Sequence, residues 1–286
     1  MFSSWSRSWE LVKASWAVLR SDKELIVFPI VSFIGSILVM IAFAIPSIAA
    51  GLIDNVQRNG TDGVGIAGLI VAFLFYLVLY TVIFFANTAL VGAAMIRLQG
   101  GDPTLSDGFR IASQRFGKIV GYALISATVG MILRALSERS GLLGRIIISI
   151  IGFVWSTATF LVVPVLAVED IGPIDAVKRS AALLKKTWGE QIVATSGMGL
   201  VFFFLIFGII VLGGILAGVF SQISGGLALL VVLGTIVAVI ALGLISSALS
   251  GIYQAALYRY ATEGEASSYF PSELVQGAFT ENRSVV

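Results

Sequence analysis

The sequence contains neither cysteine nor histidine among its 286 residues. The absence of cysteine excludes disulfide bonds and thiol nucleophiles. The absence of both residue types excludes Cys/His zinc sites and imidazole acid–base catalysis. No cofactor and no metal are therefore expected, and the sequence contains no recognisable catalytic constellation.

Charge is also scarce, since charged residues make up only 12% of the chain, compared with about 25% in ordinary soluble domains. Hydrophobic residues make up 58% and the mean hydropathy is +1.00. Such a chain cannot cover itself with a polar surface, and its net charge of +2 gives no reason to expect a nucleic-acid partner. The composition predicts an integral membrane protein.

Long apolar runs provide the spans that this prediction requires. A helix needs about 20 apolar residues to cross a bilayer, and lipid offers no partner for unpaired backbone groups. The expected fold class is an all-α, polytopic transmembrane bundle of six helices, forming a single integral membrane domain over residues 1–258 and followed by a tail at 259–286. The expected spans cover residues 25–53, 66–96, 119–136, 146–168, 192–220 and 227–257.

The positions of Lys and Arg predict the orientation of the spans. Fourteen of the 18 basic residues fall before the first span, after the sixth, or in the connections after the second and fourth. Positive charge accumulates on the cytoplasmic side. We therefore expect a multi-pass protein of the cell membrane with both termini in the cytoplasm. The polar lead of about 24 residues and the length of the first apolar run argue against a cleaved signal peptide.

Three segments on the expected cytoplasmic side have helical periodicity and basic residues beside an apolar stripe. They cover residues 2–22, 103–116 and 173–188, and we predict that they are amphipathic helices at the membrane interface. Thr104 and Asp107 fit a capping box, and Pro173 suits a first helical turn. The candidate contacts to anionic lipids are Arg7, Lys13, Arg20, Arg110, Arg115, Lys118, Lys178, Arg179, Lys185 and Lys186.

The first and third of these segments indicate an internal repeat. Val12, Lys13 and Ser15 match the spacing of Val177, Lys178 and Ser180. The repeating unit would be one interfacial helix followed by a two-span hairpin, occurring three times. Recurrence of small and basic residues by chance is the alternative.

Two intramembrane features concern packing and polarity. Small residues spaced by four predict a seam for close helix packing, within the bundle or between two copies of the chain, at Gly243, Ser247, Gly251 and Ala255. Asn87 is the most polar side chain well inside a span and is the candidate intramembrane polar site. For Asn87, an interhelical hydrogen bond is a simpler role than contact with a substrate.

Two stretches resemble a known family. They are "VVPVLAVEDIGPIDAVKRSAALLKKTWGE" near the fourth span and "ALYRYATEGEASSYFPSELVQGAF" at the end of the chain. Both resemble a family of uncharacterised prokaryotic six-span membrane proteins, a domain of unknown function. That family is distantly similar to the membrane domain attached to some glycerophosphodiester phosphodiesterases. The resemblance implies a helical membrane protein and brings no functional residues with it.

Three functions follow as hypotheses. The first is a non-catalytic, lipid-interacting or scaffold membrane protein with membrane lipids as partners, and with a second copy or another membrane protein as a further partner. The alternative is a transporter or permeation pathway for a lipid-like or small solute. An enzyme would have to use the polar residues around Glu169, Asp170 and Asp175, whose roles in capping and topology are simpler explanations.

Overall fold

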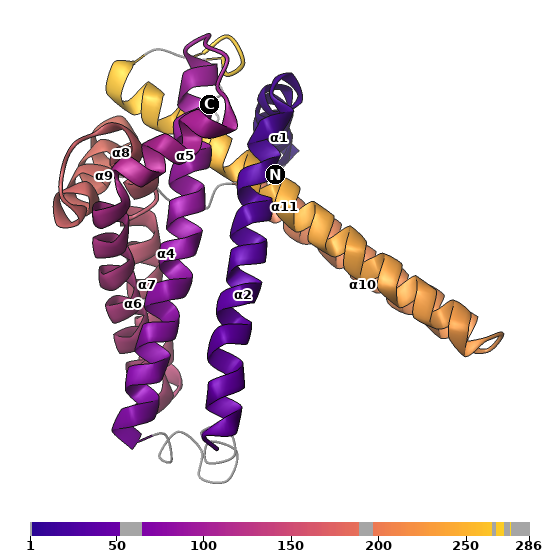
Figure 1. The fold of residues 1–286 in the computed structure, drawn as a ribbon. Helices are drawn as coiled ribbons and strands as arrows, with labels where there is room; N and C mark the ends of the chain where they lie inside the picture. Colours follow the sequence, from indigo (N-terminus) through magenta and orange to yellow (C-terminus); the bar gives the residue numbers. More distant parts are fainter. Residues whose placement is uncertain (1, 52–64, 189–196, 265–266, 272–274, 276–286) are drawn as a thin grey trace. The chain divides into compact units, whose positions relative to one another are not determined.

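The computed structural model describes residues 2–51, 65–188, 197–264, 267–271 and 275. All regular secondary structure in these residues is helical (Figure 1). Six of the described helical segments are long and apolar enough to cross a bilayer, namely Lys23–Ala49, Gly65–Leu98, Phe116–Arg139, Leu142–Val168, Val201–Ser221 and Gly225–Glu263. The predicted fold class, a polytopic all-α membrane protein with six spans, is confirmed.

The helix ends differ from the predicted span ends by a few residues. Helix α6, Phe116–Arg139, begins before the predicted residue 119. Helix α11, Gly225–Glu263, continues through residues that the prediction assigned to the tail, and it ends where Gly264 adopts a φ of 72°. This left-handed conformation is the usual helix C-terminus at glycine. The predicted start of the fifth span, residue 192, and most of the tail lie outside the described residues.

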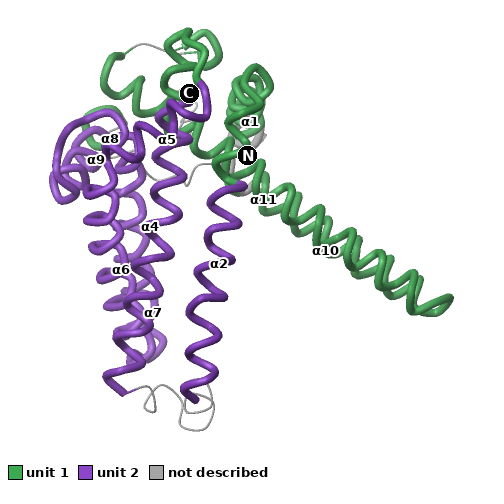
Figure 2. The backbone as a smooth tube through the Cα atoms, viewed as in Figure 1, with its two compact units in different colours: residues 1–29, 94–103, 184–286 green, residues 30–93, 104–183 purple. Residues whose placement is uncertain are grey.

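The chain forms two compact units (Figure 2). Unit 1 comprises residues 1–29, 94–103 and 184–286, and unit 2 comprises residues 30–93 and 104–183. The division falls inside α2 (Val27–Ala49), α4 (Gly65–Leu98) and α9 (Pro173–Trp188).

In unit 1, helix α1 (Phe2–Ser21) contacts both α10 (Gly197–Ser221) and α11. A short 3-10 helix, η1 (Lys23–Ile26), follows α1 and also contacts α11. Helices α10 and α11 form a hairpin with a tight turn at residues 222–224. The buried core of this unit includes Leu25, Phe28 and Tyr253.

In unit 2, the described part of α2 packs on α4, where the rings of Phe43 and Phe75 have their centroids 5.6 Å apart. Helix α4 packs in turn on α6, where the centroids of Phe84 and Tyr122 are 4.6 Å apart. Helix α6 also contacts α7 (Leu142–Ala158). The ring pairs at both crossings are half-buried or buried and contribute aromatic packing to the unit.

The fourth span is interrupted between α7 and α8 (Val162–Val168). Pro164 lies in the first turn of α8, where its missing N–H costs nothing, whereas inside a continuous helix its ring would clash with the preceding turn. The interruption leaves the N–H of Leu161 without a helical acceptor, and the hydroxyl of Ser180 on α9 accepts this hydrogen bond at 3.0 Å. Both residues are fully buried, so the hydrogen bond compensates for the interruption.

The order of elements follows the predicted repeat. A helix from each predicted interfacial segment, α1, α5 (Leu105–Gln114) and α9, precedes a pair of spans, and this order occurs three times along the chain. A shared three-dimensional arrangement of the three repeats, each made of one helix and two spans, stays a prediction.

Candidate membrane-interface site

Helix α1 has two different faces. Leu11, Ser15 and Val18 belong to a buried face, on the helix that packs against α10 and α11. Trp9 and Trp16 are 42% and 46% exposed. The apolar residues of this segment, predicted to form one stripe, are therefore divided between two faces: Val12 and Leu19 are buried, whereas the two Trp are exposed.

Two cations complete the outer face of α1. Lys13 and Arg20 are exposed, and the series Trp9, Lys13, Trp16 and Arg20 advances by four, three and four residues. This spacing places all four on one side of a helix. No ion pair joins Lys13 or Arg20 to another residue within the described ranges. The side chain of Arg7 lies outside the described residues.

Helix α9 repeats the burial pattern of α1. Ser180 and Leu183 are buried as their matches Ser15 and Val18 are, and Lys178 and Lys185 are exposed as Lys13 and Arg20 are. Ile174, at the position of Trp9, is 61% exposed. The correspondence extends the sequence match to side-chain burial.

The four predicted cations of α9 fall into two pairs. Lys178 and Arg179 bond to acids of the same unit, Lys178 to Asp175 at 3.3 Å and Arg179 to Glu169 at 2.9 Å. Lys185 and Lys186 are exposed, and no ion pair joins them to other described residues. Only the second pair thus keeps its full positive charge available.

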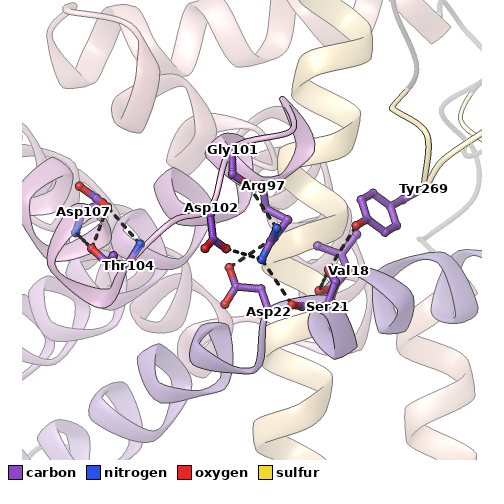
Figure 3. A network of polar contacts seen from close by, with 9 residues as sticks. All are labelled: Val18, Ser21, Asp22, Arg97, Gly101, Asp102, Thr104, Asp107 and Tyr269. Carbon is purple, nitrogen blue, oxygen red and sulfur yellow. Dashed lines mark hydrogen bonds and ion pairs between the residues drawn. The ribbon is translucent and has the colours of Figure 1, made fainter.

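Helix α5 begins with the predicted capping box, part of which Figure 3 shows. The hydroxyl of Thr104 accepts from the Asp107 backbone at 3.3 Å, and the Asp107 carboxylate accepts from the Thr104 backbone at 3.0 Å. The hydrogen bond that the Thr104 hydroxyl donates to the Asp107 carboxylate, together with the one from the Thr104 backbone, holds the pKa of Asp107 below its usual range. Arg110 donates to the same carboxylate at 2.6 Å, so it is paired within its own helix.

The remaining predicted cations, Arg115 and Lys118, lie at the start of α6 and share one partner. Both donate to the same oxygen, Oδ1, of Asp170 in the connection between α8 and α9. The hydrogen bond from Lys118, with the positive charges of Lys118 and Arg115, holds the pKa of Asp170 below its usual range. The three side chains form a charged cluster within unit 2, with one acid between two cations.

A comparison with known protein families identifies the chain at a coarse level. The model of a family of unknown function, DUF6159, matches residues 66–268, which is well over half of the chain. The chain belongs to this family. No curated protein matches it.

The structure of this DUF6159 member shows how exposed the residues of the two intramembrane predictions are. Asn87 is half-buried, and no hydrogen bond joins its side chain to another described residue, so its role stays a prediction. In the predicted seam, Gly251 and Ala255 are buried, whereas Gly243 and Ser247 are exposed.

The close approach of α10 and α11 occurs at a glycine outside the predicted seam. A Cβ placed on Gly213 would lie 2.2 Å from Oγ1 of Thr235. The contact was missed because neither residue is part of an extended small-residue pattern.

A polar network around Arg97, at the end of α4, was also missed from sequence (Figure 3). Its guanidinium donates to Asp102 at 2.7 Å and to the carbonyl oxygens of Ser21 and Gly101 at 3.3 Å each. Nε lies 3.5 Å from Oδ2 of Asp22. Burial raises the pKa of Asp22, and the charge of Arg97 opposes this rise. The network joins the end of α1 to the end of α4 within unit 1.

Residues at the end of α11 and in the tail also bond to the ends of α1 and α4. Arg259 donates to the carbonyl oxygen of Leu98 and pairs with Glu263 at 2.9 Å. The hydroxyl of Tyr269 donates to Ser21 at 3.3 Å, and the neighbouring Phe270 is buried. Arg97 and Arg259 therefore fasten helix ends together rather than facing lipid. The described residues contain no cluster of three or more metal-binding side chains.

Proposed function

We propose that this protein is a non-catalytic protein of the cell membrane, with both termini in the cytoplasm, whose cation-bearing helices bind anionic lipid headgroups. The observation that carries the proposal is the outer face of α1, where Trp9, Lys13, Trp16 and Arg20 follow one another on one side of the helix. Two of these residues are large aromatic rings that remain 42% and 46% exposed.

This combination fits the boundary between headgroups and acyl chains. Indole rings favour that depth because they are apolar and carry one N–H donor. Lys and Arg beside them attract anionic headgroups, each by about 1 kcal/mol. The exposed cations Lys185 and Lys186 of α9 are further candidates for such headgroup contacts.

The predicted lipid-contacting cations differ in whether they are paired with an acid. Arg110, Lys178 and Arg179 each bond to an acid of their own unit. Such exposed pairs contribute little to stability, but they reduce the charge offered to a headgroup. We therefore assign the main lipid contacts to Lys13, Arg20, Lys185 and Lys186.

A distant relationship to the membrane domain attached to some glycerophosphodiester phosphodiesterases would agree with a supporting role at the bilayer. That relationship, a prokaryotic origin of the family and the transport alternative stay predictions.

The proposal is tested with two matched double variants in nanodiscs of graded phosphatidylglycerol content. Lys13→Gln with Arg20→Gln should weaken association of a dansyl-labelled phosphatidylglycerol, relative to phosphatidylcholine, by about tenfold or more, because two cations contribute about 2 kcal/mol. Arg139→Gln with Arg145→Gln removes the same charge from exposed positions on the opposite predicted side and serves as the control. Equal effects of the two double variants, or none from either, would refute the proposal.

A further inference from the structure

In the cluster of Arg115, Lys118 and Asp170, the acid is far more exposed to solvent than the two cations. The side chains of Arg115 and Lys118 are 22% and 27% exposed, whereas the Asp170 side chain is 78% exposed. The acid is therefore the outermost member of the cluster. An anion that approaches from solvent meets Asp170 first and finds the two cations directly behind it.

The cluster also lies where a lipid headgroup would reach it. Arg115 is the residue before α6, and Lys118 lies in the first turn of this span. Phe116, between them in sequence, is 51% exposed and gives the start of the span an apolar side chain beside the charges. Cations at the end of a span lie at headgroup depth.

The connection that carries the acid also packs on α6 through a contact outside the ion pairs. A Cβ on Gly121, one turn after Lys118, would lie 2.9 Å from Cγ of Pro173. Pro173 begins α9 three residues after Asp170, so this close approach adds a second link between α6 and the connection that carries the acid. Removing the Asp170 charge should therefore leave the two cations where they are.

The two cations can bind a lipid phosphate in place of the carboxylate. Arg and Lys both bind phosphate oxygens strongly, and Arg does so through two parallel hydrogen bonds. The phosphodiester of a lipid headgroup carries one negative charge, as the Asp170 carboxylate does, and its two unesterified oxygens could accept from both cations, which now donate to the same Oδ1 of Asp170. A phosphate and Asp170 would repel each other, so only one of them can occupy the cation pair at a time.

We propose that Arg115 and Lys118 form a binding site for the phosphate of an anionic lipid headgroup, and that Asp170 occupies this site when no headgroup is bound. The inference rests on the proposed function and adds a specific site with an internal competitor. It predicts that loss of an acid charge strengthens lipid binding at this position more than elsewhere on the same face.

The test compares Asp170→Asn with Asp175→Asn in the purified full chain. Asp175 is a matched control, since it pairs with a single lysine at 3.3 Å and its removal changes the net charge equally. Native mass spectrometry with dioctanoyl phosphatidylglycerol should show about fivefold tighter binding for Asp170→Asn than for Asp175→Asn, the size of one exposed ion pair. Equal affinities would overturn the inference.

Two further arms identify the site and the ligand. Lys118→Gln should weaken binding and should abolish the gain from Asp170→Asn, whereas Lys178→Gln should do neither. Inorganic phosphate should compete far less well than the lipid, and equal competition would overturn the assignment to a headgroup. If the double variant of Lys13 and Arg20 weakens lipid association as proposed while Asp170→Asn and Asp175→Asn bind the lipid equally well, the inference about Asp170 fails and the proposed function stands.

Discussion

Ser180 shows how one side chain can compensate for a helix interruption inside a membrane protein. Its hydroxyl accepts the N–H of Leu161 at 3.0 Å in a fully buried position. Ser15 occupies the matching position of α1 and is equally buried, but its Oγ has no hydrogen-bond partner among the described residues. The two serines are thus alike in burial and different in bonding.

This difference gives a prediction at the scale of single residues. Ser180→Ala should lower the free energy of unfolding by about 1–3 kcal/mol, because it leaves a buried N–H unpaired. Ser15→Ala should be neutral or stabilising, since it removes a buried hydroxyl that has no described partner. Thermal unfolding in one detergent would compare the variants, and equal losses of stability would show that the hydrogen bond to Leu161 contributes little.

Residue-level prediction from sequence succeeded where the partners are close in the chain. The capping box of Thr104 and Asp107 was found because its two members are three residues apart. The Arg97 network was not found, because Ser21 lies 76 residues away in the sequence. Likewise, nothing local could indicate that Arg259 bonds to Leu98, 161 residues earlier.

At the scale of elements, the hairpin of α10 and α11 includes one especially close contact. A Cβ on Gly213 would lie 2.2 Å from Oγ1 and 2.6 Å from Cγ2 of Thr235, whereas a Cβ on Gly214 would meet nothing within 4 Å. Two adjacent glycines therefore differ completely in the space around them.

The second stability prediction follows from this contrast. Gly213→Ala should lower the melting temperature, because α10 and α11 must separate to accept the methyl group, at a cost of about 1–3 kcal/mol. Gly214→Ala should leave it unchanged or raise it, since alanine favours a helix over glycine by up to about 1 kcal/mol. Thermal unfolding in detergent measures both, and a loss of stability in Gly214→Ala that equals the loss in Gly213→Ala would contradict the assigned contact.

Spans were predictable from sequence because lipid imposes length and hydropathy directly on each helix. The faces of α1 and α9 were less predictable. Periodicity showed that each segment is a helix, but it could not show that Ser15 and Ser180, rather than the largest apolar side chains, would lie on the buried face. That choice depends on the shape of the neighbouring helices.

For the whole molecule, the chain order of one helix and two spans, found three times, places a cation-bearing segment before each hairpin. If both termini are cytoplasmic, α1, α5 and α9 all meet the same leaflet. The proposed lipid contacts on α1 and α9 and the cluster at Asp170 would then share one anionic surface.

Cysteine labelling tests this shared leaflet most directly, because the chain has no cysteine of its own and each introduced thiol is unique. Single variants Arg20→Cys, Lys185→Cys and Arg139→Cys place thiols at exposed positions. In intact cells, a membrane-impermeant maleimide should label only Arg139→Cys, and the other two should react only after permeabilisation. Labelling of Arg20→Cys or Lys185→Cys from outside the cell would contradict a cytoplasmic interface shared by α1 and α9.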